Sequence, residues 1–157
     1  MAIRRYFSIG VISMICLFSY AQLTESEDGL YYDENNELYS GSYIEFHSNG
    51  EKRIELNLHE GLKNGTVTLY YKNGEKSEIR SYKAGLKHGT WTTWNENGVK
   101  TAVANYSDDK KDGEWFIWDE NGVMRFSMLY DRGKKTGSWK MWDEKANLLS
   151  EMDYSKE

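Results

Sequence analysis

The chain has 157 residues, a net charge of −5 at neutral pH and a single cysteine. This acidic balance keeps a protein soluble and disfavours general binding to nucleic acid or to anionic membrane. One cysteine is too few for a disulfide framework or for a thiolate zinc site.

The first residues have the order of a secretory signal peptide. Two arginines precede an apolar run over residues 6–18, and a Ser-Tyr-Ala sequence then ends at Ala21. The run is shorter than the roughly 20 residues that a membrane-spanning helix needs. We therefore expect residues 1–21 to be a signal peptide and the protein to be exported, to the periplasm, the cell envelope or the medium. Removal of this segment takes away Cys16 and lowers 20 basic residues to 18 against 25 acidic ones, a net charge of −7.

From Gly41 onward the sequence repeats with a period of 24 residues. Within each unit a run of aromatic and β-branched residues leads to a turn, and a second apolar-polar run follows. Two extended runs joined by a short turn are typical of a β-hairpin. We expect an N-terminal segment with a partial repeat over 22–40, followed by five tandem repeats over 41–157. The repeats are 41–64, 65–88, 89–112, 113–136 and 137–157.

Turn glycines mark the middle of the first four repeats. Each follows an asparagine, and the pair suits either a two-residue type I′ turn or a type I turn whose glycine takes a left-handed bulge position. Both turns require positive φ, which glycine adopts without strain. A second tight reversal near Gly61, Gly85 and Gly133 returns the chain to the next unit. The structural turn glycines are Gly50, Gly74, Gly98 and Gly122.

These hairpins predict an all-β fold. Lying side by side, they would form a single-layer antiparallel meander of about ten strands. After the signal-like segment, no apolar pattern with a 3.6-residue period is long enough for a helix. Each repeat would therefore contact mainly its neighbours, and side chains 24 positions apart would become neighbours in space.

The repeats also resemble a known family. The pattern Tyr-x-x-Gly-x-x-His-Gly-x-Trp over residues 82–91 has a copy over residues 130–139, in which Thr136 replaces the histidine. It is similar to the variant class of MORN repeats, which occurs in bacterial proteins grouped as YwqK-family antitoxins. The resemblance covers about residues 29–157. It implies a hairpin-repeat fold and a partner that is a toxin or another envelope component.

All six tryptophans fall in two columns that recur every 24 residues. The simpler interpretation is that they form the core, because indoles bury large areas and cover one another in a sheet without helices. Alternatively, one column stays exposed as a binding platform. Residues three apart point to opposite faces of a regular strand, so both columns share one face only if a bulge intervenes. The columns are Trp91, Trp115 and Trp139, and Trp94, Trp118 and Trp142.

Lysine recurs at one offset in four repeats, at turns along one long edge of the expected sheet. Successive lysines would lie about 10 Å apart, or two strand spacings. Such a row could contact lipid headgroups or an acidic partner, while solvated turn lysines explain it more simply. The row consists of Lys63, Lys87, Lys111 and Lys135.

The sequence shows no pattern typical of catalysis or of a cofactor site. No cysteine remains after residue 21, the three histidines occupy three different offsets, and no glycine-rich phosphate loop is present. We expect no catalytic residue, no cofactor and no bound metal ion. The favoured function is therefore a non-enzymatic protein-binding module, and the resemblance adds an antitoxin-like role. The alternatives are a peripheral protein that binds membrane lipid or an envelope polymer, and a structural spacer; nucleic acid is not an expected partner.

Overall fold

The computed structural model describes residues 23–155, so the expected signal peptide lies outside the described residues. The described chain consists of β-strands and connecting turns. Among these residues there is no helix with the length and apolar character needed to cross a membrane.

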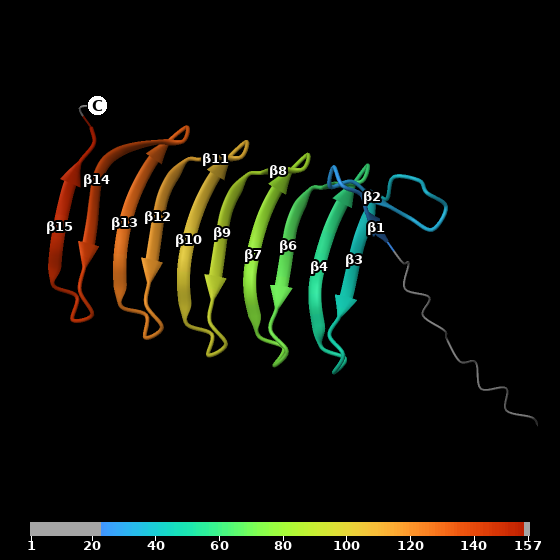
Figure 1. Ribbon diagram of the computed structural model, residues 1–157, viewed down its shortest axis with the longest axis horizontal. Helices are drawn as coiled ribbons and strands as arrows, with labels where there is room; N and C mark the ends of the chain where they lie inside the picture. The colour runs from blue at the N-terminus through green and yellow to red at the C-terminus, as the bar shows by residue number, and fades with distance from the viewer. Residues whose placement is uncertain (1–22, 156–157) are drawn as a thin grey trace, which may run out of the picture.

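The long strands form one antiparallel sheet in which neighbours along the chain are neighbours in space (Figure 1). This order confirms the predicted single-layer meander of consecutive hairpins. In sequence, the strands are β3 (Gly41–Phe46), β4 (Lys52–His59), β6 (Gly65–Tyr70), β7 (Lys76–Lys83), β9 (Gly89–Trp94), β10 (Lys100–Ser107), β12 (Gly113–Trp118), β13 (Met124–Asp131), β14 (Lys134–Trp142) and β15 (Leu148–Asp153).

Shorter strands complete the structure. One two-residue strand follows each of the second strands of the first three hairpins and pairs back onto it. A separate two-stranded sheet precedes the main one. The short strands are β5 (Leu62–Lys63), β8 (Leu86–Lys87) and β11 (Lys110–Lys111), and the separate pair is β1 (Thr24–Glu25) and β2 (Tyr31–Tyr32).

The connections between repeats are two-residue turns with positive φ at both central positions. Glu60 and Gly61 have φ of 49° and 74°. This is the type I′ geometry, whose twist matches the twist of paired strands. Where the connecting glycine is missing, Asp109 takes its place with φ of 66°. Aspartate tolerates the left-handed region because its short polar side chain bonds locally.

These turns are hydrogen-bonded to one another along the sheet edge. In each case the backbone N–H at the second turn position donates to a carbonyl of the preceding repeat, at 2.7–2.9 Å. The turns therefore form a continuous backbone row beside the strands. The bonds run from Gly85 to Lys63, from Asp109 to Lys87 and from Gly133 to Lys111.

The Asn-Gly turns at the other edge adopt the second of the two predicted geometries. In the third hairpin the Gly98 N–H donates to the Asn95 carbonyl at 2.9 Å, and Gly98 has φ of 75°. Asn97 is not left-handed, so the turn is type I followed by a bulge glycine. All four turn glycines have positive φ: Gly50 88°, Gly74 86°, Gly98 75° and Gly122 82°.

Every hairpin contains one bulge near this edge. In the third hairpin Thr93 pairs with Ala102 and Trp94 pairs with Lys100, so Thr101 is the extra residue. The bulge lies in the second strand, and the first strand keeps its regular alternation of faces. The extra residues recur with the repeat and are Arg53, Ser77, Thr101, Arg125 and Leu149.

The buried core lies at the N-terminal end of the sheet. Leu56, Leu58 and Val67 pack there with Tyr31, which comes from the segment that precedes the first hairpin. The Tyr31 N–H donates to the Gly61 carbonyl at 2.9 Å and joins this segment to the row of turns. The chain thus covers one end of the sheet with its own N-terminal segment, beside β3 and β4 in Figure 1.

The replacement Gly98→Ala tests the turn geometry. No atom lies within 4 Å of the position that a Cβ would take at Gly98, so steric contact adds no penalty. The left-handed φ alone should lower the free energy of unfolding by about 1 kcal/mol. Gly98→Asn should cost less, because asparagine tolerates this region. Urea unfolding of both variants checks the order, and an alanine variant as stable as the wild type would contradict it.

Candidate functional site

The two tryptophan columns lie on opposite faces of the sheet. The first strand of each hairpin has no extra residue, so tryptophans three positions apart point in opposite directions. The ring contact between Phe116 and Trp118, with centroids 5.8 Å apart, places Trp118 on the face away from Trp115. We call the face with Trp91, Trp115 and Trp139 the ladder face and the other the opposite face.

An unbroken row of aromatic rings crosses the ladder face. Tryptophans from the first strand of each hairpin alternate with tyrosines near the end of the second strand. Neighbouring centroids lie 5.0–5.4 Å apart in tilted or edge-to-face arrangements, which aromatic pairs prefer. The aromatic ladder consists of Tyr82, Trp91, Tyr106, Trp115, Tyr130, Trp139 and Tyr154.

Each ladder tryptophan is fixed by the same hydrogen bond. Its indole N–H donates to a backbone carbonyl ten residues earlier, at 2.9–3.0 Å. The indoles therefore have no free donor to offer a ligand, and their orientation is set by the sheet. The acceptors for Trp91, Trp115 and Trp139 are the carbonyls of Ser81, Asn105 and Leu129.

The tryptophans are half-buried and do not form the buried core. All six keep part of their surface exposed, whereas the four buried apolar side chains, Tyr31, Leu56, Leu58 and Val67, lie at the N-terminal end. The rings of the first column cover one another, as the core interpretation expects, while the fully buried side chains lie at the N-terminal end of the sheet. A single layer cannot enclose its indoles, because nothing packs over them from a second layer.

The four predicted lysines lie over the aromatic ladder. Each ammonium group lies near two aromatic rings, at distances typical of cation–π contacts; for Lys87, Lys111 and Lys135 the two rings belong to neighbouring strands. The short strands β5, β8 and β11 bring three of them back over the sheet. The following distances run from Nζ to the ring centroid. Lys63 lies 5.2 Å from Tyr31 and 6.0 Å from Tyr82, and Lys87 lies 5.1 Å from Trp91 and 5.3 Å from Tyr106. Lys111 lies 4.4 Å from Trp115 and 4.9 Å from Tyr130, and Lys135 lies 4.5 Å from Trp139 and 5.0 Å from Tyr154.

The charges of three of these lysines are not neutralised by carboxylates. Lys63 forms an ion pair with Glu25 at 3.3 Å. Within residues 23–155, Lys87, Lys111 and Lys135 have no carboxylate oxygen within 4.0 Å of their ammonium groups. These three form the lysine row of the ladder face.

Tyr82 and Tyr106 of the aromatic ladder do not supply compensating negative charge. Burial among the rings raises the pKa of Tyr82 and of Tyr106 above their usual value of 10.0. Both hydroxyls therefore stay neutral at physiological pH. Lys87, which lies over Trp91 and Tyr106, therefore faces an apolar surface without a negative charge.

The opposite face carries a second, sparser set of aromatic–lysine contacts. Lys52 lies 5.9 Å from the Tyr70 ring, and Lys100 lies 5.9 Å from the Trp118 ring. Trp94 lines a shallow hollow of about 360 Å³ together with Tyr70 and Lys76. The lysines at 52, 76 and 100 were not among the predicted site residues, although their 24-residue spacing is visible in the sequence.

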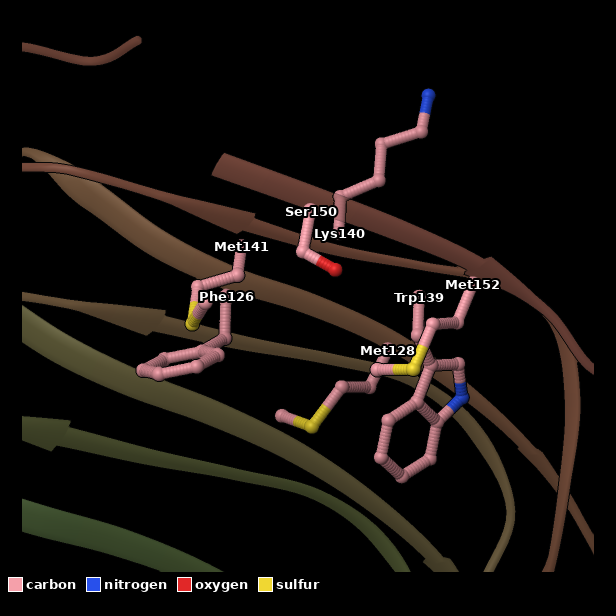
Figure 2. Close-up of a pocket in the computed structure, with 7 residues that line it drawn as sticks. All are labelled: Phe126, Met128, Trp139, Lys140, Met141, Ser150 and Met152. Carbon is pink, nitrogen blue, oxygen red and sulfur yellow. The ribbon is translucent and has the colours of Figure 1, made fainter. Parts of the chain in front are cut away.

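The C-terminal end of the ladder face contains an open apolar groove of about 250 Å³. Figure 2 shows Phe126, Met128, Trp139, Met141 and Met152 around it, while the Lys140 side chain extends away. They come from three adjacent strands, β13, β14 and β15. Only Trp139 of this groove was a predicted site residue. The sequence did not indicate the methionines as site residues, because their position in the groove depends on how the strands pair.

Titratable side chains lie both on the strands and in the turns of the described chain. In the part of the chain that the structure describes, no group of three His, Cys, Asp or Glu residues is arranged to hold a metal ion. The ladder face presents ammonium groups, aromatic rings and methionine thioethers.

Comparison with known families agrees with this geometry. Residues 63–84, 87–108 and 111–132 match the MORN repeat variant family. Three tandem segments of the chain are thus similar to this repeat. Each segment begins at a lysine of the ladder face and ends at the first residue of a type I′ turn. No curated protein sequence matches the chain.

Replacement of Trp115 tests the aromatic ladder. Trp115→Ala removes the ring between Tyr106 and Tyr130 and should lower the free energy of unfolding by about 3 kcal/mol. Trp115→Phe keeps a smaller ring there and loses the bond to the Asn105 carbonyl together with part of the apolar contact, so a smaller loss of about 1–2 kcal/mol is expected. Urea unfolding measures both. Equal losses in the two variants would contradict a stabilising role for ring packing.

Proposed function

We propose that this protein is a non-catalytic repeat scaffold that binds an acidic partner protein on its ladder face. The observation that carries the proposal is the lysine row: Lys87, Lys111 and Lys135 lie over aromatic rings without a carboxylate partner. Ammonium groups held in this way have already lost much of their conformational freedom. Binding therefore costs less entropy than ordering three free lysines would.

The spacing of the row suits an extended protein surface. Successive lysines belong to successive hairpins, about 10 Å apart, which is close to the Debye length at 0.1 M salt. The row is thus a local positive stripe on a chain whose net charge is −5. Complementary acidic groups would set the orientation of the partner and speed association.

A protein partner is favoured over a membrane surface. The net negative charge of the chain opposes approach to anionic lipid, whereas a partner protein can place its carboxylates on the lysine row alone. The half-exposed aromatic rings beside the lysines are typical of the residues found at protein interfaces. A spacer without a ligand would need the rings for stability but would not need lysines without carboxylate partners above them.

Exchange of the lysine row tests this function. The triple variant Lys87→Gln, Lys111→Gln, Lys135→Gln should bind the partner at least about tenfold more weakly, because charged contacts across an interface are lost. The matched control replaces three exposed lysines away from the row, Lys72, Lys83 and Lys145, with glutamine and changes the net charge equally. Affinity capture with the full-length chain, followed by titration of each retained protein against both triples, provides the measurement.

The control decides the interpretation. A partner that both triples bind with equal affinity would contradict the proposal. Flotation with anionic vesicles that is lost only in the lysine-row triple would favour the lipid alternative. An antitoxin-like role is one form of the proposed function, and it requires that a captured partner be a toxin that the wild-type chain neutralises and the lysine-row triple does not.

We also propose that the protein acts after export. The order of charged, apolar and small residues over 1–21 supports this. In the native host, the intact mass of the protein should correspond to a chain that begins after Ala21. A mass that includes residues 1–21 would refute cleavage at this position.

A further inference from the structure

The apolar groove on the ladder face has a lining that fits one class of small ligand. Phe126 and Met152 are 37% and 51% exposed, so the groove opens directly to solvent. Three of the four methionines in residues 23–155 line it, namely Met128, Met141 and Met152. Methionine side chains are flexible and adapt their shape to apolar ligands. The hydroxyl of Ser150 is the one uncharged polar side-chain group in the lining.

A positive charge stands beside this apolar lining. The Lys135 ammonium lies 4.5 Å from the ring of Trp139, which itself lines the groove. It has no carboxylate partner among the described residues. Lys140, the charged residue whose backbone belongs to the lining, directs its side chain away (Figure 2). The groove therefore has an apolar floor with the Lys135 ammonium beside it, over a ring that itself belongs to the lining.

This combination excludes the other obvious occupants. A peptide would bring backbone N–H and C=O groups into a lining that has almost no partner for them, and unpaired polar groups are costly to bury. A soft metal cation would suit the thioether sulfurs, but the nearby Lys135 ammonium would repel it. A ligand with an apolar chain and one anionic head group avoids both the burial of unpaired polar groups and repulsion by the Lys135 ammonium.

We propose that the groove binds a single-chain carboxylate amphiphile, a medium-chain fatty acid, with its acyl chain along Met128, Met141 and Met152 and its carboxylate at Lys135. The volume of about 250 Å³ lies just below the usual range of drug-sized pockets, so it accommodates one chain of moderate length. Burial of the methylene groups supplies most of the affinity. The ammonium contact selects the anionic head group. The site does not depend on the proposed protein partner.

Methionine-methyl NMR of the full-length chain with sodium decanoate tests the location. The methyl signals of Met128, Met141 and Met152 should shift, and that of Met124, which lies outside the groove, should stay unchanged. Single Met→Leu variants assign the signals and keep the volume of each side chain. No shift, or an equal shift at Met124, would overturn the proposal.

Matched lysine variants test the head-group contact. Lys135→Gln should weaken decanoate binding about fivefold or more and leave decanol binding unchanged, because decanol lacks the charge. Lys87→Gln is the control, since Lys87 lies over Trp91 at 5.1 Å and over Tyr106 at 5.3 Å, and neither ring belongs to a strand that lines the groove. An equal loss in both variants would overturn the assignment of Lys135. Calorimetric titration gives both affinities.

A variant of the floor completes the test. Met152→Gln, at a half-exposed position of β15, places an amide in the groove and should weaken decanoate and decanol alike. Undiminished binding of both ligands would overturn the proposed path of the acyl chain. The partner-protein proposal is tested separately. Lys87 belongs to the lysine row but lies away from the groove, so Lys87→Gln should weaken protein binding without changing decanoate binding.

Discussion

The structure depends on aromatic rings that cover one another within a single layer. Within residues 23–155, no second layer packs over the ladder face beyond its N-terminal end, so apolar area leaves the solvent chiefly through side-by-side contact between neighbouring strands. The ladder rings meet at 5.0–5.4 Å from Tyr82 to Tyr154. This contact requires equal hairpins, since a shift by one residue would move an indole to the other face. The strict 24-residue period of the sequence follows from this constraint.

Much of the fold could be predicted from this period. The details that could not be predicted have one cause in common. The position of the Asn-Gly pairs predicted hairpins, but the same residues suit two turn types. The faces of Trp115 and Trp118 depend on which strand carries the bulge, and the extra residue proved to be Arg125 of the second strand. The place of Met128 in the groove depends on pairing between strands. Sequence records the spacing along the chain, whereas these features arise between chain segments.

The two ends of the ladder face differ in what covers them. At the N-terminal end the segment before β3 brings Tyr31 onto Leu56 and Val67, and its Glu25 neutralises Lys63. At the other end the rings of Phe126 and Trp139 border an open groove, and Lys135 keeps its charge. One repeated surface thus becomes a stabilised core at one end and an exposed aromatic and cationic surface at the other. The predicted lysine at 63 belongs to the first region and the remaining three to the second.

The hydrogen bonds between successive type I′ turns tie each hairpin to the one before it by the same geometric step. A seam of this kind, meaning the row of these hydrogen bonds along the sheet edge, has no preferred length. In every added hairpin the turn N–H donates to the preceding hairpin, and the equivalent carbonyl accepts from the next. Duplication or loss of a whole 24-residue unit would leave the seam intact, while any other change in length would interrupt it. The reach of the binding surface can therefore evolve in whole hairpins without redesign of a core.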